Sequence, residues 1–177
     1  MNKIEVIGTL RDGEKEYKQG HLYLLDAPRK SDTIDTLMVF ANEELPVGPV
    51  KVTGKLQSGY IHKVGVPTYI LPETIEALES VDALSDASIT GTLKKDPVCR
   101  QTKKNKNICT ILVVTDDGTV PVLLWGDVAK EAPEKYRAGD RLNVRGRLQS
   151  REYPGKDEGK RTAWELSARK VALVKEA

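Results

Sequence analysis

The stretch VRGRLQS at residues 144–150 repeats an earlier stretch, VTGKLQS at residues 52–58. A second matched pair, VIGTL at residues 6–10 and ITGTL at residues 89–93, precedes them in the same order. Two pairs that keep their order indicate a tandem duplication of a unit of roughly 85 residues. The chain is therefore expected to build one small domain twice.

The second copy has the clearer pattern of secondary structure. A helix capped by Asp127 is expected to run to about Tyr136, with Pro133 as an interruption or a second start. The dipeptide Asp117-Gly118 predicts a tight turn. Alternating and β-branched segments predict strands at residues 87–93, 108–114, 120–125, 141–153 and 161–171. Three strands, a helix and two strands is the order of an OB-fold, a five-stranded Greek-key barrel.

The first copy follows this order but is shorter between its third and fourth strands. Phe40 takes the place of Trp125 and Tyr69 that of Trp164, yet Phe40 precedes Gly54 by 14 residues whereas Trp125 precedes Gly146 by 21. The missing residues fall on the helix. Strands are expected at residues 3–10, 21–26, 36–41, 50–57 and 68–71.

The predicted fold class is therefore all-β, with two tandem OB-fold barrels of which the first lacks most of the helix. The expected domains are residues 1–78, structural or dimerising, and residues 87–174, ligand-binding. A short acidic linker at residues 79–86, with at most one helical turn, would join them.

Charge divides the chain. Residues 1–85 carry 9 Lys/Arg and 13 Asp/Glu, a net of −4, and the remainder carries 28 − 9 = 19 against 26 − 13 = 13, a net of +6. A basic half often marks an anionic partner, although an ordinary solvated surface has the same composition. No apolar run is long enough to cross a membrane, so a cytoplasmic, nucleoid-associated location is expected.

Catalytic and metal-binding patterns are absent from the sequence. There is no Gly-rich phosphate loop and no Ser/His/Asp set, so we expect neither an enzyme nor a cofactor or metal site. Cys99 and Cys109 could face one another if the segment between them forms a hairpin. In a reducing compartment they are expected to be free thiols.

The long strand at residues 141–153 has one polar face. Side chains alternate along a strand, which places Arg145, Arg147, Arg151 and Tyr153 on one side with no acid among them. Guanidinium groups pair with phosphates, and an aromatic ring can hold a base. This face is a candidate nucleic-acid surface, or else an ordinary solvent-facing strand.

Further candidates lie outside this strand. The loop joining the first two strands of an OB barrel borders the ligand groove, and this one carries four cations. Trp125 and Trp164 fit either a core or a contact role. The first copy offers weaker equivalents. The loop cations are Arg100, Lys103, Lys104 and Lys106, and the weaker candidates are Phe40, Lys51, Lys55, Tyr60 and Trp164.

Residues 86–174 resemble the bacterial single-stranded DNA-binding protein family. The resemblance rests on the segments ITGTL at 89–93, LLWG at 123–126, YRAGD at 136–140, VRGRLQSREY at 144–153 and RTAWEL at 161–166. It implies an OB-fold that binds single strands by base stacking and backbone charge. Trp125 and Tyr153 match stacking positions of the family.

The resemblance predicts binding of single-stranded DNA with little sequence preference, in replication, recombination or repair. Association into a homodimer through the barrels is expected, and other replication proteins are possible partners. Two alternatives stay open from the sequence. One is an interaction module of a replication or primosome complex with weak strand binding, which the degenerate first copy favours. The other is an RNA-binding OB protein.

Overall fold

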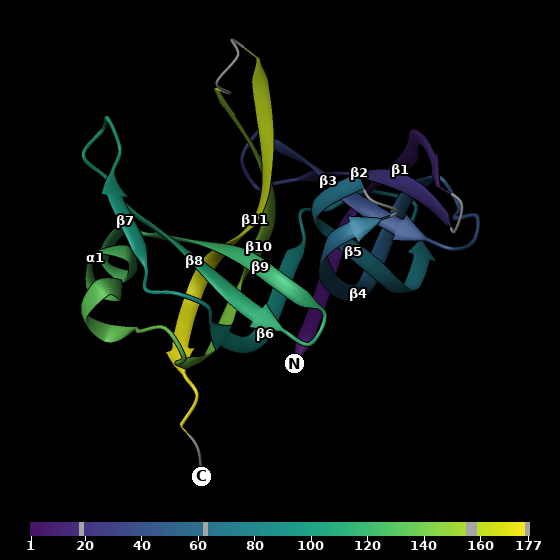
Figure 1. Cartoon of the computed structure of the whole chain (residues 1–177). Coiled ribbons are helices and arrows are strands. Elements are labelled where there is room, and N and C mark those ends of the chain that lie inside the picture. Colours follow the sequence, from purple (N-terminus) through teal and green to yellow (C-terminus); the bar gives the residue numbers. More distant parts are fainter. Residues whose placement is uncertain (18–19, 62–63, 155–158, 176–177) are drawn as a thin grey trace.

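The first copy forms a closed five-stranded barrel. The computed structural model describes residues 1–17, 20–61, 64–154 and 159–175 (Figure 1). Strand β1 pairs with both β2 and β4, and a parallel contact between β3 and β5 closes the circuit. The strands are β1 (Asn2–Tyr17), β2 (Gly20–Pro28), β3 (Ile34–Ala41), β4 (Gly48–Ile61) and β5 (Val64–Ala77).

The second copy repeats this circuit and adds a strand and a helix. Strand β6 pairs with β8 and β10, β11 pairs with β10, and a parallel contact joins β9 to β11. Strand β7 adds to β8 outside the circuit. The elements are β6 (Ser85–Leu93), β7 (Val98–Gln101), β8 (Asn107–Thr115), β9 (Gly118–Trp125), α1 (Gly126–Lys135), β10 (Arg141–Pro154) and β11 (Lys160–Leu173). The predicted tandem OB-fold is confirmed.

The repeated glycines lie where strands cross most closely. A Cβ atom on Gly54 would come 2.2 Å from the carbonyl oxygen of Leu71, and one on Gly146 would come 2.0 Å from that of Ser167. Both distances are well inside van der Waals contact, so only glycine fits. Both ladders also shift register immediately before the glycine, a bulge that bends the strand around its barrel.

A ladder of backbone pairs joins the two barrels. Asn2 to Val6 of β1 lie antiparallel to β6, from Ile89 to Ser85. Most buried apolar residues of both barrels form one continuous cluster, which includes Ile4 and Ile89, both 0% exposed, and a smaller second cluster lies in the first barrel. The barrels therefore share a sheet as well as a core, and Figure 1 shows them side by side along this seam.

Helix α1 differs in detail from its prediction. It begins at Gly126, directly after Trp125, and no side chain caps it, so the expectation of Asp127 as the cap was wrong. Asp127 instead lies in the first turn, where a negative charge favours the helix dipole. Pro133 lies within the helix, which continues to Lys135. No helix among the described residues is long and apolar enough to cross a bilayer.

The expected linker is also shorter than predicted. Strand β5 extends to Ala77 and β6 begins at Ser85, so most of the predicted linker joins these two strands without regular structure. Residues 78–84 contain no helical turn, so the turn considered for the linker is absent.

Cys99 and Cys109 are joined by a disulfide, which corrects the expectation of free thiols. They lie directly opposite one another in the β7–β8 ladder, with their Cα atoms 4.0 Å apart. Strands β7 and β8 form the hairpin that this pairing requires. The expectation of free thiols rested only on a reducing compartment, and the structure places the two cysteines in a disulfide. The bond ties β7 to β8, the strand with which it pairs.

Candidate nucleic-acid interface

One row of side chains crosses the outer face of β7, β8 and β9. Arg100 lies opposite Ile108, and Ile108 lies opposite Trp125. Directly opposed residues share a face of a sheet, so these three side chains lie side by side. The next residues, Cys109 and Leu124, face the core instead. Trp125 ends this row with 39% of its surface exposed.

The basic hairpin (Arg100, Lys103, Lys104 and Lys106) flanks this row. Arg100 lies in β7 rather than in the loop predicted for it, and the lysines lie in the turn before β8. All four side chains are exposed. Within the described part of the chain none of them is in an ion pair. Their charge is available to an external anion.

Tyr153 lies near the outer end of β10, where this strand pairs with β11. The outer ends of β10 and β11 extend beyond the barrel on the same side as the β7–β8 hairpin, toward the top of Figure 1. Tyr153 is 37% exposed there, and the Arg151 guanidinium carbon lies 5.8 Å from its ring centroid. A cation at this distance over the face of an aromatic ring is attracted to it, which stabilises the pair and helps to hold the Tyr153 ring in place.

Two of the three arginines on this face of β10 are held by acids from other strands. Arg145 donates two hydrogen bonds to Asp86, at 3.0 and 2.7 Å, and this pairing raises its pKa. Arg151 donates to buried Glu165 at 2.7 Å, and that bond raises the Arg151 pKa. Neither arginine is an uncompensated cation, and a phosphate would compete with Asp86 or Glu165 for it, so their assignment to phosphates stays a prediction.

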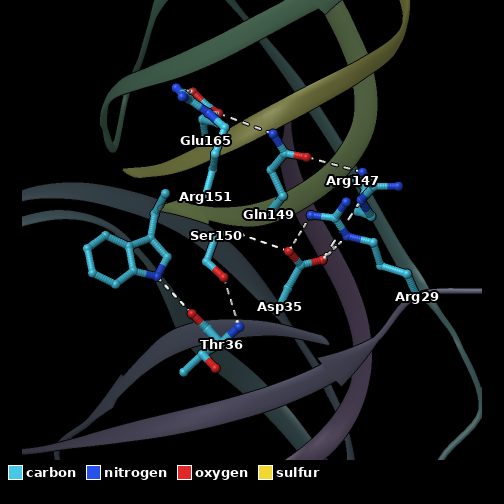
Figure 2. A network of polar contacts seen from close by, with 9 residues as sticks. Arg29, Asp35, Thr36, Arg147, Gln149, Ser150, Arg151 and Glu165 are labelled. Atoms are coloured by element: carbon cyan, nitrogen blue, oxygen red, sulfur yellow. Dashed lines mark hydrogen bonds and ion pairs between the residues drawn. The ribbon is translucent and has the colours of Figure 1, made fainter. Parts of the chain in front are cut away.

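Arg147, the third, lies where the barrels meet (Figure 2). Its nearest acid is Asp35 of β3, at 3.9 Å, and it donates a hydrogen bond to Gln149 at 3.1 Å. Asp35 itself accepts two hydrogen bonds from Arg29, at 2.7 and 2.8 Å, and one from the Ser150 backbone at 3.1 Å. This face of β10 therefore packs partly against the first barrel.

Trp164 belongs to the same junction. Its indole N–H donates to the Thr36 carbonyl at 2.9 Å, and the Ser150 hydroxyl accepts a bond from the Thr36 backbone N–H at 2.9 Å. The ring is partly buried against the cores of both barrels. A structural role accounts for this residue.

The first-copy aromatics do not occupy the positions expected. In the paired ladders, Val39 corresponds to Val122, which places Phe40 at the position of Leu123. Asn42 then corresponds to Trp125. Tyr69 lies opposite Gln57 as Glu165 lies opposite Gln149, so its expected match to Trp164 was one residue off.

Phe40 and Tyr69 are buried together rather than displayed. Their exposed fractions are 8% and 6%, and their rings meet edge to face at 6.2 Å. Of the other first-copy candidates, Lys55 lies 4.0 Å from Glu73 and Lys51 is partly exposed on β4. The side chain of Tyr60 lies outside the described residues. No exposed aromatic ring of the described first barrel matches Trp125.

Sequence reasoning missed the acids that organise the junction. Asp35 is 2% exposed and lies in β3. The expected third strand began at residue 36, so Asp35 fell outside it and no pattern marked this acid as buried. Glu165, also buried, was equally unmarked.

Comparisons with known proteins identify the family and the fold. A family model described as the single-strand binding protein family matches residues 84–174. A thylakoid-associated single-stranded DNA-binding protein of Synechocystis sp. is 32% identical over 94 residues, which cover 49% of this chain and 73% of that protein.

Solved structures match over the full length. The single-stranded DNA-binding protein of Thermus aquaticus superposes with a TM-score of 0.71 at 22% identity, covering 100% of this chain and 94% of that one. A deletion mutant of the same protein gives a TM-score of 0.70, also at 22% identity, with 100% and 96% covered. Because these matches cover the whole chain, both barrels share the fold of the Thermus aquaticus protein. With an OB barrel, an exposed tryptophan beside a basic hairpin, and a family model that spans the second copy, this chain belongs to the single-strand binding protein family.

Proposed function

We propose that the second barrel binds single-stranded DNA across the outer face of β7, β8 and β9, with little sequence preference. The observation that carries this is Trp125, an exposed ring in the same row as Arg100 and beside three lysines that are in no ion pair with any described residue. Bases would stack on Trp125 and on Tyr153, and the basic hairpin would hold phosphates. Every base has a π-face, so this mode tolerates any sequence.

A fluorescence titration tests the proposal. Trp125 is one of only two tryptophans, so stacking should quench a large part of the intrinsic emission. We expect strong, salt-sensitive quenching by oligo-dT and much weaker quenching by duplex DNA of equal length. Equal binding of oligo-rU would extend the ligand to RNA. Absence of oligo-dT binding would favour the interaction module and reject the proposal.

Neutralising the basic hairpin should weaken binding and flatten its salt dependence. Each phosphate contact to a single strand contributes about 0.7 to the slope of log K against log salt concentration. The variant Lys103→Ala/Lys104→Ala/Lys106→Ala should therefore lower the slope by about 2, measured by titration at several salt concentrations. A slope equal to that of the unaltered chain would place the phosphates elsewhere.

We further propose that this binding serves DNA replication, recombination or repair at a cytoplasmic site. Association of two copies through the first barrel, and the division into a supporting and a ligand-binding barrel, also remain proposals. What supports the division is the burial of Phe40 and Tyr69, in contrast with the exposure of Trp125.

A further inference from the structure

A pocket of about 320 Å³ lies at the junction of the two barrels. We call it the junction pocket. It lies apart from the basic hairpin and is lined by the β2–β3 connection, the segment that leads into β6, and the outer faces of β10 and β11. The polar residues that line it are Arg29, Lys30, Ser85, Asp86, Arg147 and Arg169.

Positive charge exceeds negative charge around this pocket. Four of its lining residues are cations. Arg145 is a fifth cation nearby, because it pairs with the lining residue Asp86. The acids are two, Asp86 and the neighbouring Asp35. Asp86 is already paired with both Arg145 and Arg169, at 2.7 and 3.1 Å. An excess of three positive charges therefore remains beside the cavity.

The hydrogen bonding of Arg147 is incomplete. Asp35 accepts from Arg29 and from the Ser150 backbone, so the Arg147 guanidinium stays 3.9 Å away. The Arg147 Nε is buried without a hydrogen-bond partner, as is the Ser85 hydroxyl on another wall of the pocket. Burial, and next the charge of Arg29, lower the pKa of Arg147. An unpaired buried donor is costly, so the Arg147 side chain is poorly compensated within the described residues. The Nε and the Ser85 hydroxyl have no exposed surface, so an anion in the pocket would meet the exposed third of the Arg147 side chain instead.

We propose that the junction pocket binds a phosphate group. We assign this phosphate to the backbone of a single strand that passes from the second barrel onto the first, an assignment that rests on the function proposed above. Guanidinium groups suit phosphate because their paired N–H donors match its oxygens. The same chemistry would accept a free phosphate or pyrophosphate, and the test below separates the two sources.

The variant Lys30→Ala/Arg169→Ala removes two pocket cations without orphaning an acid. Within the described residues Lys30 is in no ion pair, and Asp86 keeps Arg145 when Arg169 is lost. A matched control, Lys94→Ala/Lys175→Ala, removes two exposed lysines that lie just beyond the ends of β6 and β11. Both variants change the net charge equally, so a difference between them reports on position.

Two oligo-dT lengths locate the contact along the strand. An OB barrel covers about 4–16 nucleotides, so about 8 nucleotides fill one barrel and about 30 span both. For the pocket variant we expect roughly 3- to 10-fold weaker binding of the long oligonucleotide and a salt slope lower by about 0.7 per lost contact. Binding of the short one should be unchanged. The control should match the unaltered chain.

A thermal-shift assay with pyrophosphate tests the anion site without DNA. A ligand that binds only the folded chain raises the unfolding temperature, so the unaltered chain should be stabilised and the pocket variant should not. Equal stabilisation of both would overturn the phosphate site. Pyrophosphate stabilisation that is lost in the variant, with long oligo-dT binding unaffected, would overturn the strand assignment. If the unaltered chain binds no oligo-dT, the proposed function fails, whatever pyrophosphate does.

Discussion

Replacing Trp125 and Tyr153 together by alanine should weaken oligo-dT binding by at least about 30-fold. Stacking of a base on an aromatic ring contributes about 1–3 kcal/mol, so loss of two rings removes about 2–6 kcal/mol. Both rings are more than a third exposed, at 39% and 37%, so neither supports the core. The measurement is a titration followed by fluorescence anisotropy of a labelled oligonucleotide, since the variant loses a reporting tryptophan.

The control is the pair Trp125→Phe/Tyr153→Phe. Phenylalanine keeps a ring at both positions, so most of the affinity should return. An alanine pair that binds as tightly as the unaltered chain would contradict the stacking assignment. A phenylalanine pair as weak as the alanine pair would indicate that the indole N–H or the phenol hydroxyl carries the contact instead.

Asp35→Ala should lower the free energy of unfolding by about 3–5 kcal/mol, the usual effect of removing one partner of a buried ion pair. The carboxylate is 2% exposed, and its loss leaves Arg29 and the Ser150 N–H without their acceptor. Because the second barrel supplies Ser150, the substitution also weakens the junction. Urea unfolding measures the effect through the midpoint and slope of the transition.

Asp26→Ala is the matched control. Asp26 also pairs with an arginine, Arg11 at 2.8 Å, but its side chain is 30% exposed and its partner 51%. Water screens such a pair, so we expect a loss of less than about 1 kcal/mol. Equal losses at the two positions would mean that burial of Asp35 does not set its contribution.

The barrels could be predicted from the sequence because their determinants are local. Alternation marked the strands, and the repeated segments marked the two copies. That the glycines in these segments lie where a Cβ on Gly54 or Gly146 would meet a carbonyl oxygen was seen only in the structure. The register between strands was less accessible. The two copies were matched by their aromatic residues, which misplaced Phe40 by two residues and Tyr69 by one relative to the paired strands of the second copy.

The candidate site was predicted only in part. Tyr153 and the basic hairpin were selected because the polar face of a strand and a cationic turn can be recognised in the sequence. Trp125 fitted either a core or a contact role, and the family resemblance selected it. That these residues contact a ligand stays a prediction.

The partners of the β10 arginines were not predicted. Arg145 pairs with an acid 59 residues away, and Arg147 lies 3.9 Å from Asp35 of the other barrel. Glu165, which accepts from Arg151, is only 14 residues away, but its position depends on the register between β10 and β11. The fold therefore brings acids from other strands against the face of β10 that carries none of its own.

The ladder between β1 and β6 fixes the two barrels as one body. Two binding modules on a flexible tether meet the second part of a ligand at an effective concentration set by tether length. Here the span between the modules is set by hydrogen bonds instead. A strand held by one barrel would meet the other at a single distance and angle, so avidity would depend sharply on strand length and little on chain entropy.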